Sequence, residues 1–152
     1  MTGDTNDGWI RLLEEMDEME AALEREGWET LSIPAGDTAA VGPGAVAEHH
    51  GYAYVGPGDR ADAFEALFVP DGFSRTEIYR QTAAGQLYLL TVSFDPPTRR
   101  AVLLAGLIEV GSLAECRRHA RETGRMYSHV LRVDGTVVGS FEHDDPEPFF
   151  PE

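Results

Sequence analysis

The sequence contains no lysine, so arginine supplies all 12 of its permanently basic side chains. This absence excludes several kinds of site, because a P-loop phosphate clamp, a Schiff base and a pyridoxal attachment each need a lysine amine. No dinucleotide fingerprint follows a predicted strand either. The glycine-rich pieces Gly42-Pro43-Gly44 and Gly56-Pro57-Gly58 carry proline where a phosphate loop needs free backbone amides, and we interpret them as turns.

Cysteine and long apolar runs are also scarce. Cys116 is the only cysteine, which excludes an intramolecular disulfide and a cluster of thiolate metal ligands. Its place on the apolar side of a predicted helix favours a buried, unreactive thiol. No apolar run approaches the length of a membrane span, and residues 1–7 lack the basic and apolar regions of a signal peptide. We therefore expect a cytoplasmic protein that makes no membrane contact.

Negative charge is abundant. The chain has 27 Asp and Glu residues against 12 Arg, which gives a formal net charge of -15. A surface this acidic repels itself in dilute buffer, whereas molar salt shortens the Debye length to about 3 Å and removes most of the repulsion. The composition therefore indicates adaptation to a salt-saturated cytoplasm, with an acidic protein of ordinary salinity as the alternative. Binding to nucleic acid is not expected, because it needs a basic surface.

A three-stranded antiparallel meander is the predicted centre of the fold. Three strand-like runs, 76–82, 86–94 and 100–110, are separated by the turn signals Ala83-Ala84-Gly85 and Asp95-Pro96-Pro97-Thr98. The third run is apolar on both faces, so we expect a central strand that is covered from both sides. At 152 residues the chain fits a single domain.

Helices and a second hairpin complete the predicted fold. An amphipathic helix is expected between Asp7 and Gly27, and the capping box Ser112-Leu113-Ala114-Glu115 predicts the start of a later helix. Asp134-Gly135 is the strongest hairpin signal in the chain. We therefore predict a single α+β domain. In it, one antiparallel sheet, made of the meander plus the C-terminal hairpin, packs with two or three helices.

The two ends of the chain are predicted to differ from the body. Residues 1–7 are expected to be flexible. Residues 144–152 contain three prolines, which we expect to exclude regular structure. Phe149 and Phe150 in this tail are expected to dock either back onto the domain or onto a protein partner.

The register of the second hairpin brings four polar side chains together. A two-residue turn at Asp134-Gly135 sets Tyr127 opposite Glu142 and His129 opposite Ser140, all on one face. A serine facing a histidine with a carboxylate nearby has the composition of a nucleophilic site, but no G-x-S-x-G elbow surrounds Ser140. We interpret the four residues as a candidate polar pocket, with a hydrogen-bonded end of the sheet as the structural alternative.

The case for a metal site rests on residue counting alone. His49, His143 and Asp144 are the candidate ligands. The sequence contains no H-x-x-x-H, no H-E-x-x-H and no loop of spaced carboxylates, which are the patterns that place ligands around one ion. We therefore predict no metal and no other cofactor.

Five short segments, spread over the chain after the first helix, carry a resemblance to known sequences. They are Gly36-Asp37-Thr38-Ala39-Ala40, Glu77-Ile78-Tyr79-Arg80, Gly124-Arg125-Met126-Tyr127-Ser128-His129-Val130, Asp134-Gly135-Thr136 and Gly139-Ser140-Phe141-Glu142-His143-Asp144-Asp145. Together they resemble a small family of uncharacterised, acidic haloarchaeal proteins. The resemblance implies a haloarchaeal cytoplasmic protein and brings no activity, cofactor or catalytic residue with it.

We expect the protein to be a non-catalytic interaction or small-ligand-binding module, because the sequence contains no catalytic residues at the spacing of a known catalytic motif. A homodimer or a foreign protein partner would use the apolar face of the first helix or the Phe149-Phe150 tail. The alternative is a small hydrolase or metal-dependent enzyme with its site on the C-terminal hairpin, at Tyr127, His129, Ser140 and Glu142.

Overall fold

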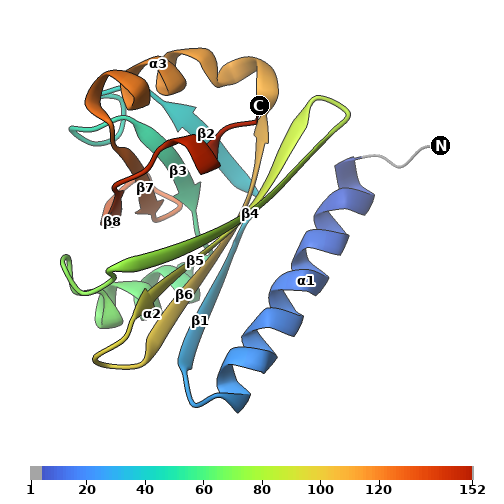
Figure 1. Cartoon of the computed structure of the whole chain (residues 1–152), viewed down its shortest axis with the longest axis vertical. Coiled ribbons are helices and arrows are strands. Elements are labelled where there is room, and N and C mark those ends of the chain that lie inside the picture. The colour runs from blue at the N-terminus through green and yellow to red at the C-terminus, as the bar shows by residue number, and fades with distance from the viewer. Residues whose placement is uncertain (1–4, 152) are drawn as a thin grey trace.

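The computed structural model describes residues 5–151 and has an α+β fold (Figure 1). Two four-stranded sheets pack face to face, and α1 (Thr5–Arg25) lies across the outer face of the first sheet. α2 (Gly58–Leu67) and α3 (Ala114–Thr123) lie towards opposite ends of the space between the sheets, and each contributes buried side chains to it. Over the described range, no helix is both long enough and apolar enough to cross a membrane.

The first sheet contains the predicted meander. Its strands are, in spatial order, β1 (Glu29–Ala35), β6 (Arg100–Glu109), β5 (Gln86–Asp95) and β4 (Arg75–Ala83). β4, β5 and β6 pair antiparallel as predicted, and β6 is a central strand. Side chains of β6 alternate between two cores: Val102 and Leu104 face the second sheet, whereas Leu103 and Ala105 face α1. The prediction that this strand is covered from both sides is therefore confirmed.

The second sheet contains the C-terminal hairpin. Its strands are, in spatial order, β2 (Asp37–Val41), β3 (Gly51–Val55), β7 (Met126–Leu131) and β8 (Val137–His143). The prediction of one antiparallel sheet is therefore wrong, because the meander and the hairpin lie in different sheets. Each sheet also contains a parallel pair, β1 with β6 and β3 with β7. Apolar alternation identifies strands and their buried faces, but it does not say which strands are neighbours across long stretches of chain.

The start of α3 corrects the predicted capping box. Ser112 lies in a 3-10 turn (Val110–Ser112), and its hydroxyl donates back to the carbonyl of Glu109 at 2.8 Å. Leu113 occupies the N-cap position and no side chain caps the helix. Cys116 of α3 is 1 % exposed, so the predicted buried thiol is confirmed, and burial raises its pKa to about 12.

Both ends of the chain contain helical turns that the sequence analysis did not predict. Asn6 and Asp7 belong to α1, and the rest of the segment predicted to be flexible, residues 1–4, lies outside the described residues. The tail forms a 3-10 turn (Glu147–Phe149) despite its prolines. Phe149 and Phe150 are 0 % and 1 % exposed, packed within their own domain. Both rings are therefore docked onto their own domain, in the space between the sheets.

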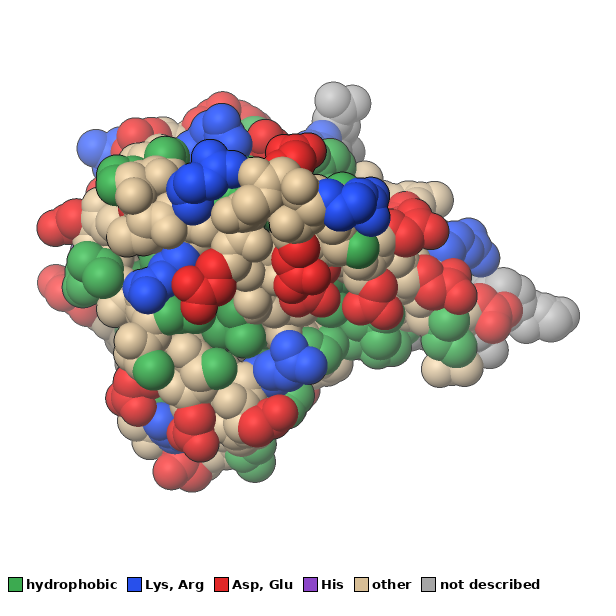
Figure 2. All heavy atoms as spheres, turned by 90° about the horizontal axis from the view of Figure 1, so that it is seen from below, with side chains coloured by type: hydrophobic (Ala, Val, Ile, Leu, Met, Phe, Trp, Pro, Cys, Tyr) green, Lys and Arg blue, Asp and Glu red, His purple; other side chains and the backbone are tan. Residues whose placement is uncertain are grey.

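The surface carries the acidic character of the sequence. Figure 2 shows acidic side chains spread over one face of the molecule with arginines among them. Some arginines pair with these carboxylates; Arg132, for example, binds both Asp62 and Glu65 of α2. Exposed pairs of this kind contribute little to stability. With 27 acidic residues and 12 arginines, most of the negative charge remains uncompensated and depends on salt for screening.

Candidate functional site

The four hairpin residues lie on one face of β7 and β8. Tyr127 pairs with Glu142 and His129 pairs with Ser140, as the sequence predicts. The predicted two-residue turn is nevertheless wrong. The strands shift register by one residue at Leu131, so the loop between them is longer. The shift offsets the longer loop, so the pairs at the far end of the hairpin have the predicted register.

His129 is the centre of this group. Its Nε2 lies 3.0 Å from the carbonyl oxygen of His49, which can only accept a hydrogen bond, so Nε2 carries the proton. Burial lowers the pKa of His129, and the ring is therefore neutral near pH 7. Its Nδ1 then accepts a hydrogen bond from the hydroxyl of Ser140 at 2.7 Å. Ser140 and His129 are hydrogen-bonded in the same way as a catalytic serine and its base. The carbonyl of His49 takes the place of the carboxylate that usually orients the histidine.

Aromatic rings fill the space around this pair. The ring of His49 stacks on Tyr127 with centroids 4.3 Å apart, and the ring of Tyr127 lies parallel to that of His129 at 6.2 Å. Gly51 lets the start of β3 lie close to the backbone of Tyr127, since a Cβ at that position would lie 2.2 Å from the carbonyl oxygen of Tyr127. The side chain of His49 is half exposed, whereas His129 is 1 % exposed. The group is thus a packed column of rings with one solvent-facing end.

Two further residues hold the group in place and were missed by the sequence analysis. Arg125 pairs with Glu142 at 3.1 Å and with Asp144 at 2.9 Å. His50 is 2 % exposed, and its Nε2 donates to the carbonyl of Arg125 at 2.8 Å. His50 and Arg125 are 75 positions apart in the sequence, so no local pattern signals the contact.

The three candidate metal ligands do not come together. His143 opposes Met126 in the hairpin register, which places it on the face opposite that of His129. Asp144 is paired with Arg125. Within residues 5–151, no three His, Cys, Asp or Glu side chains gather in a way that could hold a metal ion. His49, His143 and Asp144 are therefore not gathered around one point in the structure.

His143 instead belongs to a buried polar network between the sheets. Its Nε2 lies 2.9 Å from the hydroxyl of Ser128, and its Nδ1 lies 3.4 Å from the hydroxyl of Thr76 on β4. The ring also packs on Phe149 at 4.5 Å. Burial lowers the pKa of His143 to about 4, so the side chain is neutral over most of the pH range. Thr76, His143 and Phe149 border a hollow of about 320 Å³ between β4 and the end of β8.

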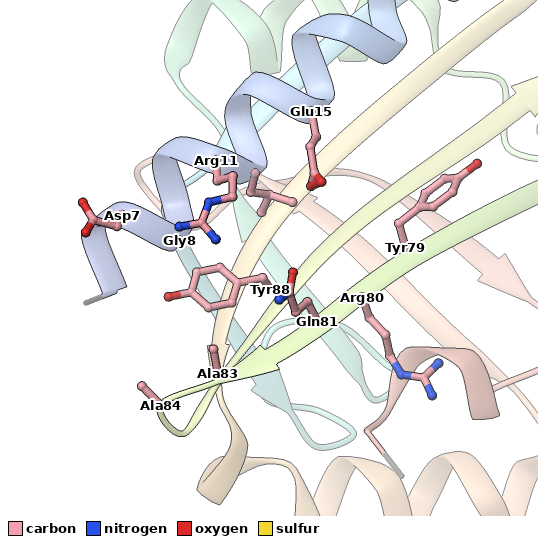
Figure 3. Close-up of a pocket in the computed structure, with 11 residues that line it drawn as sticks. Asp7, Gly8, Arg11, Glu15, Tyr79, Arg80, Gln81, Ala83, Ala84 and Tyr88 are labelled. Atoms are coloured by element: carbon pink, nitrogen blue, oxygen red, sulfur yellow. The ribbon is translucent and has the colours of Figure 1, made fainter. Parts of the chain in front are cut away.

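A second groove lies on the other side of the first sheet, between α1 and β4 (Figure 3). β4 is an edge strand of its sheet, and α1 packs mainly on β1, β5 and β6. The face of β4 on the α1 side of the sheet is therefore uncovered. The groove has a volume of about 260 Å³. It is lined by Asp7, Gly8, Arg11, Leu12 and Glu15 of α1, by Tyr79, Arg80, Gln81 and Ala83 of β4, and by Ala84 and Tyr88.

The groove combines aromatic surface with a few polar groups. The Tyr88 ring forms part of its lining, and Gly8 makes room for that ring, because a Cβ at Gly8 would lie 2.5 Å from the Tyr88 hydroxyl. Tyr79 is 45 % exposed and donates from its hydroxyl to Glu77 at 2.9 Å. Desolvation and this neighbouring carboxylate raise the pKa of Tyr79. Concave sites with apolar walls and a few polar groups are typical binding sites.

The sequence analysis did not find the groove, because no motif marks its residues. Arg11 and Glu15 are ordinary polar positions of an amphipathic helix, and Tyr79 is an ordinary strand residue. The available signal was β4 itself, whose side chains are polar on both faces apart from Ile78, Tyr79 and Ala83. A strand with this pattern belongs at the edge of a sheet, where one face remains open.

These features define a small α+β protein with two packed sheets, a buried histidine–serine hydrogen bond and a groove beside its first helix. The chain belongs to a family of unknown function, DUF7529, which matches residues 1–151. This agrees with the expected resemblance to an uncharacterised family. Neither a curated protein nor a solved structure matches the chain.

Proposed function

We propose that the protein is a non-catalytic, small-ligand-binding module of a haloarchaeal cytoplasm, and that its ligand binds in the groove between α1 and β4. The groove is the observation that carries the proposal. It is concave, partly aromatic, and bordered by one helix and one open strand. The hairpin group is less suited to binding, because the His129 ring already uses both of its nitrogens within the protein.

A fragment screen monitored by ¹H–¹⁵N NMR in molar KCl tests this function. Bound fragments are expected to shift the amide resonances of residues 7–15, 79–84 and 88. Replacing Tyr79 and Gln81 together with alanine should weaken binding about tenfold, which corresponds to about 1.4 kcal/mol. Val133→Ala provides the control, because this side chain is 77 % exposed in the β7–β8 loop, away from the groove. Shifts confined to other regions, or no binder at all, would exclude the groove as the site.

The hairpin group supports the enzyme as a second candidate, because the 2.7 Å hydrogen bond already directs the lone pair of His129 Nδ1 at the Ser140 hydroxyl. As a hydrolase, the protein would transfer an acyl group from an ester to Ser140 Oγ, while His129 takes the hydroxyl proton and returns it to the departing alcohol. Water would then release the acid.

Two variants separate the candidates. Under the non-catalytic function, His129→Ala should lower the free energy of unfolding by about 1 to 3 kcal/mol, because it leaves the Ser140 hydroxyl and the His49 carbonyl without their partner. Ser140→Ala should cost less, and neither should change ligand binding in the groove. Urea unfolding in molar KCl measures the first effect. Incubation with p-nitrophenyl acetate followed by intact mass analysis tests the enzyme. An acetyl adduct on Ser140 that disappears in His129→Ala would establish the catalytic function instead.

A further inference from the structure

Four charged residues line the groove, and two of them, Arg11 and Glu15, have opposite charges but do not pair with each other. Arg11 and Glu15 are one helical turn apart on the flank of α1 that borders β4, and both line the groove (Figure 3). Side chains at this spacing are neighbours, about 6 Å apart at Cβ, and are close enough to form an ion pair. Here neither residue forms an ion pair or a side-chain hydrogen bond with another described residue. The guanidinium and the carboxylate are both available to a ligand.

A ligand that carries both charges satisfies both groups. A guanidinium binds a carboxylate through two parallel hydrogen bonds, and a carboxylate accepts well from an ammonium group. Building on the function proposed above, we propose that the groove binds a free α-amino acid, with Arg11 on its carboxylate and Glu15 on its ammonium group. The ligand as a whole is neutral, so it is not repelled by the acidic surface of the protein.

The residues that line the groove indicate which kind of amino-acid side chain fits it. Leu12 and the rings of Tyr79 and Tyr88 provide apolar surface, and Gln81 is paired with Tyr88 across β4 and β5 (Figure 3). A volume of about 260 Å³ is below the usual range for drug-sized ligands and suits a molecule the size of one amino acid. An apolar or aromatic side chain therefore fits best. Because Arg11 and Glu15 lie at the surface, added salt should weaken their contacts with the ligand.

Calorimetric titration of the full-length protein with three related probes tests the proposal. L-Phenylalanine carries both charges, L-phenylalaninamide lacks the carboxylate, and N-acetyl-L-phenylalanine lacks the ammonium group. We expect L-phenylalanine to bind about tenfold or more tightly than either analogue. Arg11→Ala should abolish the preference over the amide, and Glu15→Gln should abolish the preference over the acetylated form. L-Leucine should bind with the same dependence on both residues.

Matched substitutions on the same helix serve as controls. Arg25→Ala and Glu14→Gln remove the same charges at exposed positions outside the groove, and both should bind L-phenylalanine as the unmodified protein does. Equal affinity for all three probes, or full affinity in Arg11→Ala and Glu15→Gln, would overturn the amino-acid assignment. If amino acids fail to bind while NMR fragments still bind in the groove, only this inference falls. If nothing binds there, the proposed function falls with it.

Discussion

Replacing Phe149 with alanine should lower the free energy of unfolding by about 3 to 5 kcal/mol, the range typical of buried phenylalanine. The ring is 0 % exposed and packs against His143 at 4.5 Å and Tyr52 at 6.4 Å, from β8 and β3 respectively. The backbone of the same residue is also held, because the Tyr52 hydroxyl donates to its carbonyl at 2.6 Å. Removing the ring leaves a cavity at the place where the tail closes the space between the sheets.

Urea unfolding in molar KCl at neutral pH measures this loss. Val133→Ala is the control and should change stability by less than about 0.5 kcal/mol, because the side chain is exposed. A loss below about 1 kcal/mol for Phe149→Ala would mean that the tail does not stay docked in solution. In that case Phe149 and Phe150 would again be candidates for binding a partner.

The tail illustrates what the sequence predicts and what it leaves open. Two phenylalanines among prolines and acids predict docking, because two adjacent aromatic side chains are costly to leave in water. The target of that docking depends on where β3, β4 and α3 lie in space. Tyr52, which binds the Phe149 carbonyl, is 97 positions away in the chain. No pattern within the tail encodes such a distant contact.

The strands show the same division between local and distant information. Predicted runs 76–82 and 86–94 correspond to β4 (Arg75–Ala83) and β5 (Gln86–Asp95), because turn residues and apolar runs are local signals. The parallel pairing of β1 with β6 joins residues about 70 positions apart, and apolar alternation is satisfied by either pairing. Strand positions were therefore predictable, whereas the division into two sheets was not.

The same difference between local and distant signals decides how much of each candidate site could be predicted. The pairs Tyr127–Glu142 and His129–Ser140 were predicted from the nearby turn signal, and they hold because the one-residue shift at Leu131 offsets the longer loop. The loop that supplies the His49 carbonyl and the groove beside α1 were not predicted, since each joins elements that are distant in sequence. The groove in particular exists because α1 leaves β4 uncovered, and that depends on how the helix lies across the sheet.

Acidification should destabilise the protein through His143. Burial lowers its pKa to about 4 in the folded state, against 6.5 for an ordinary histidine, so the folded protein binds this proton less readily than the unfolded chain. Above pH 6.5 the ring is neutral in both states and its contribution to stability is fully present. As the pH falls from 6.5 towards 4, only the unfolded state gains the proton, and about 3 kcal/mol of stability is lost. Below pH 4 both states are protonated and no further loss arises from this residue.

His143→Gln isolates this effect from the titration of the carboxylates, which occurs over part of the same pH range. Glutamine keeps hydrogen-bonding groups near Ser128 and Thr76 but carries no proton that titrates. Urea unfolding of both proteins at pH 7.5 and pH 4.5, at constant salt, should show a loss about 2 to 3 kcal/mol larger for the unmodified protein. Equal losses would mean that His143 titrates normally in the folded state. The network between the sheets would then be open to water, because only solvation of the charged ring removes the cost of burying it.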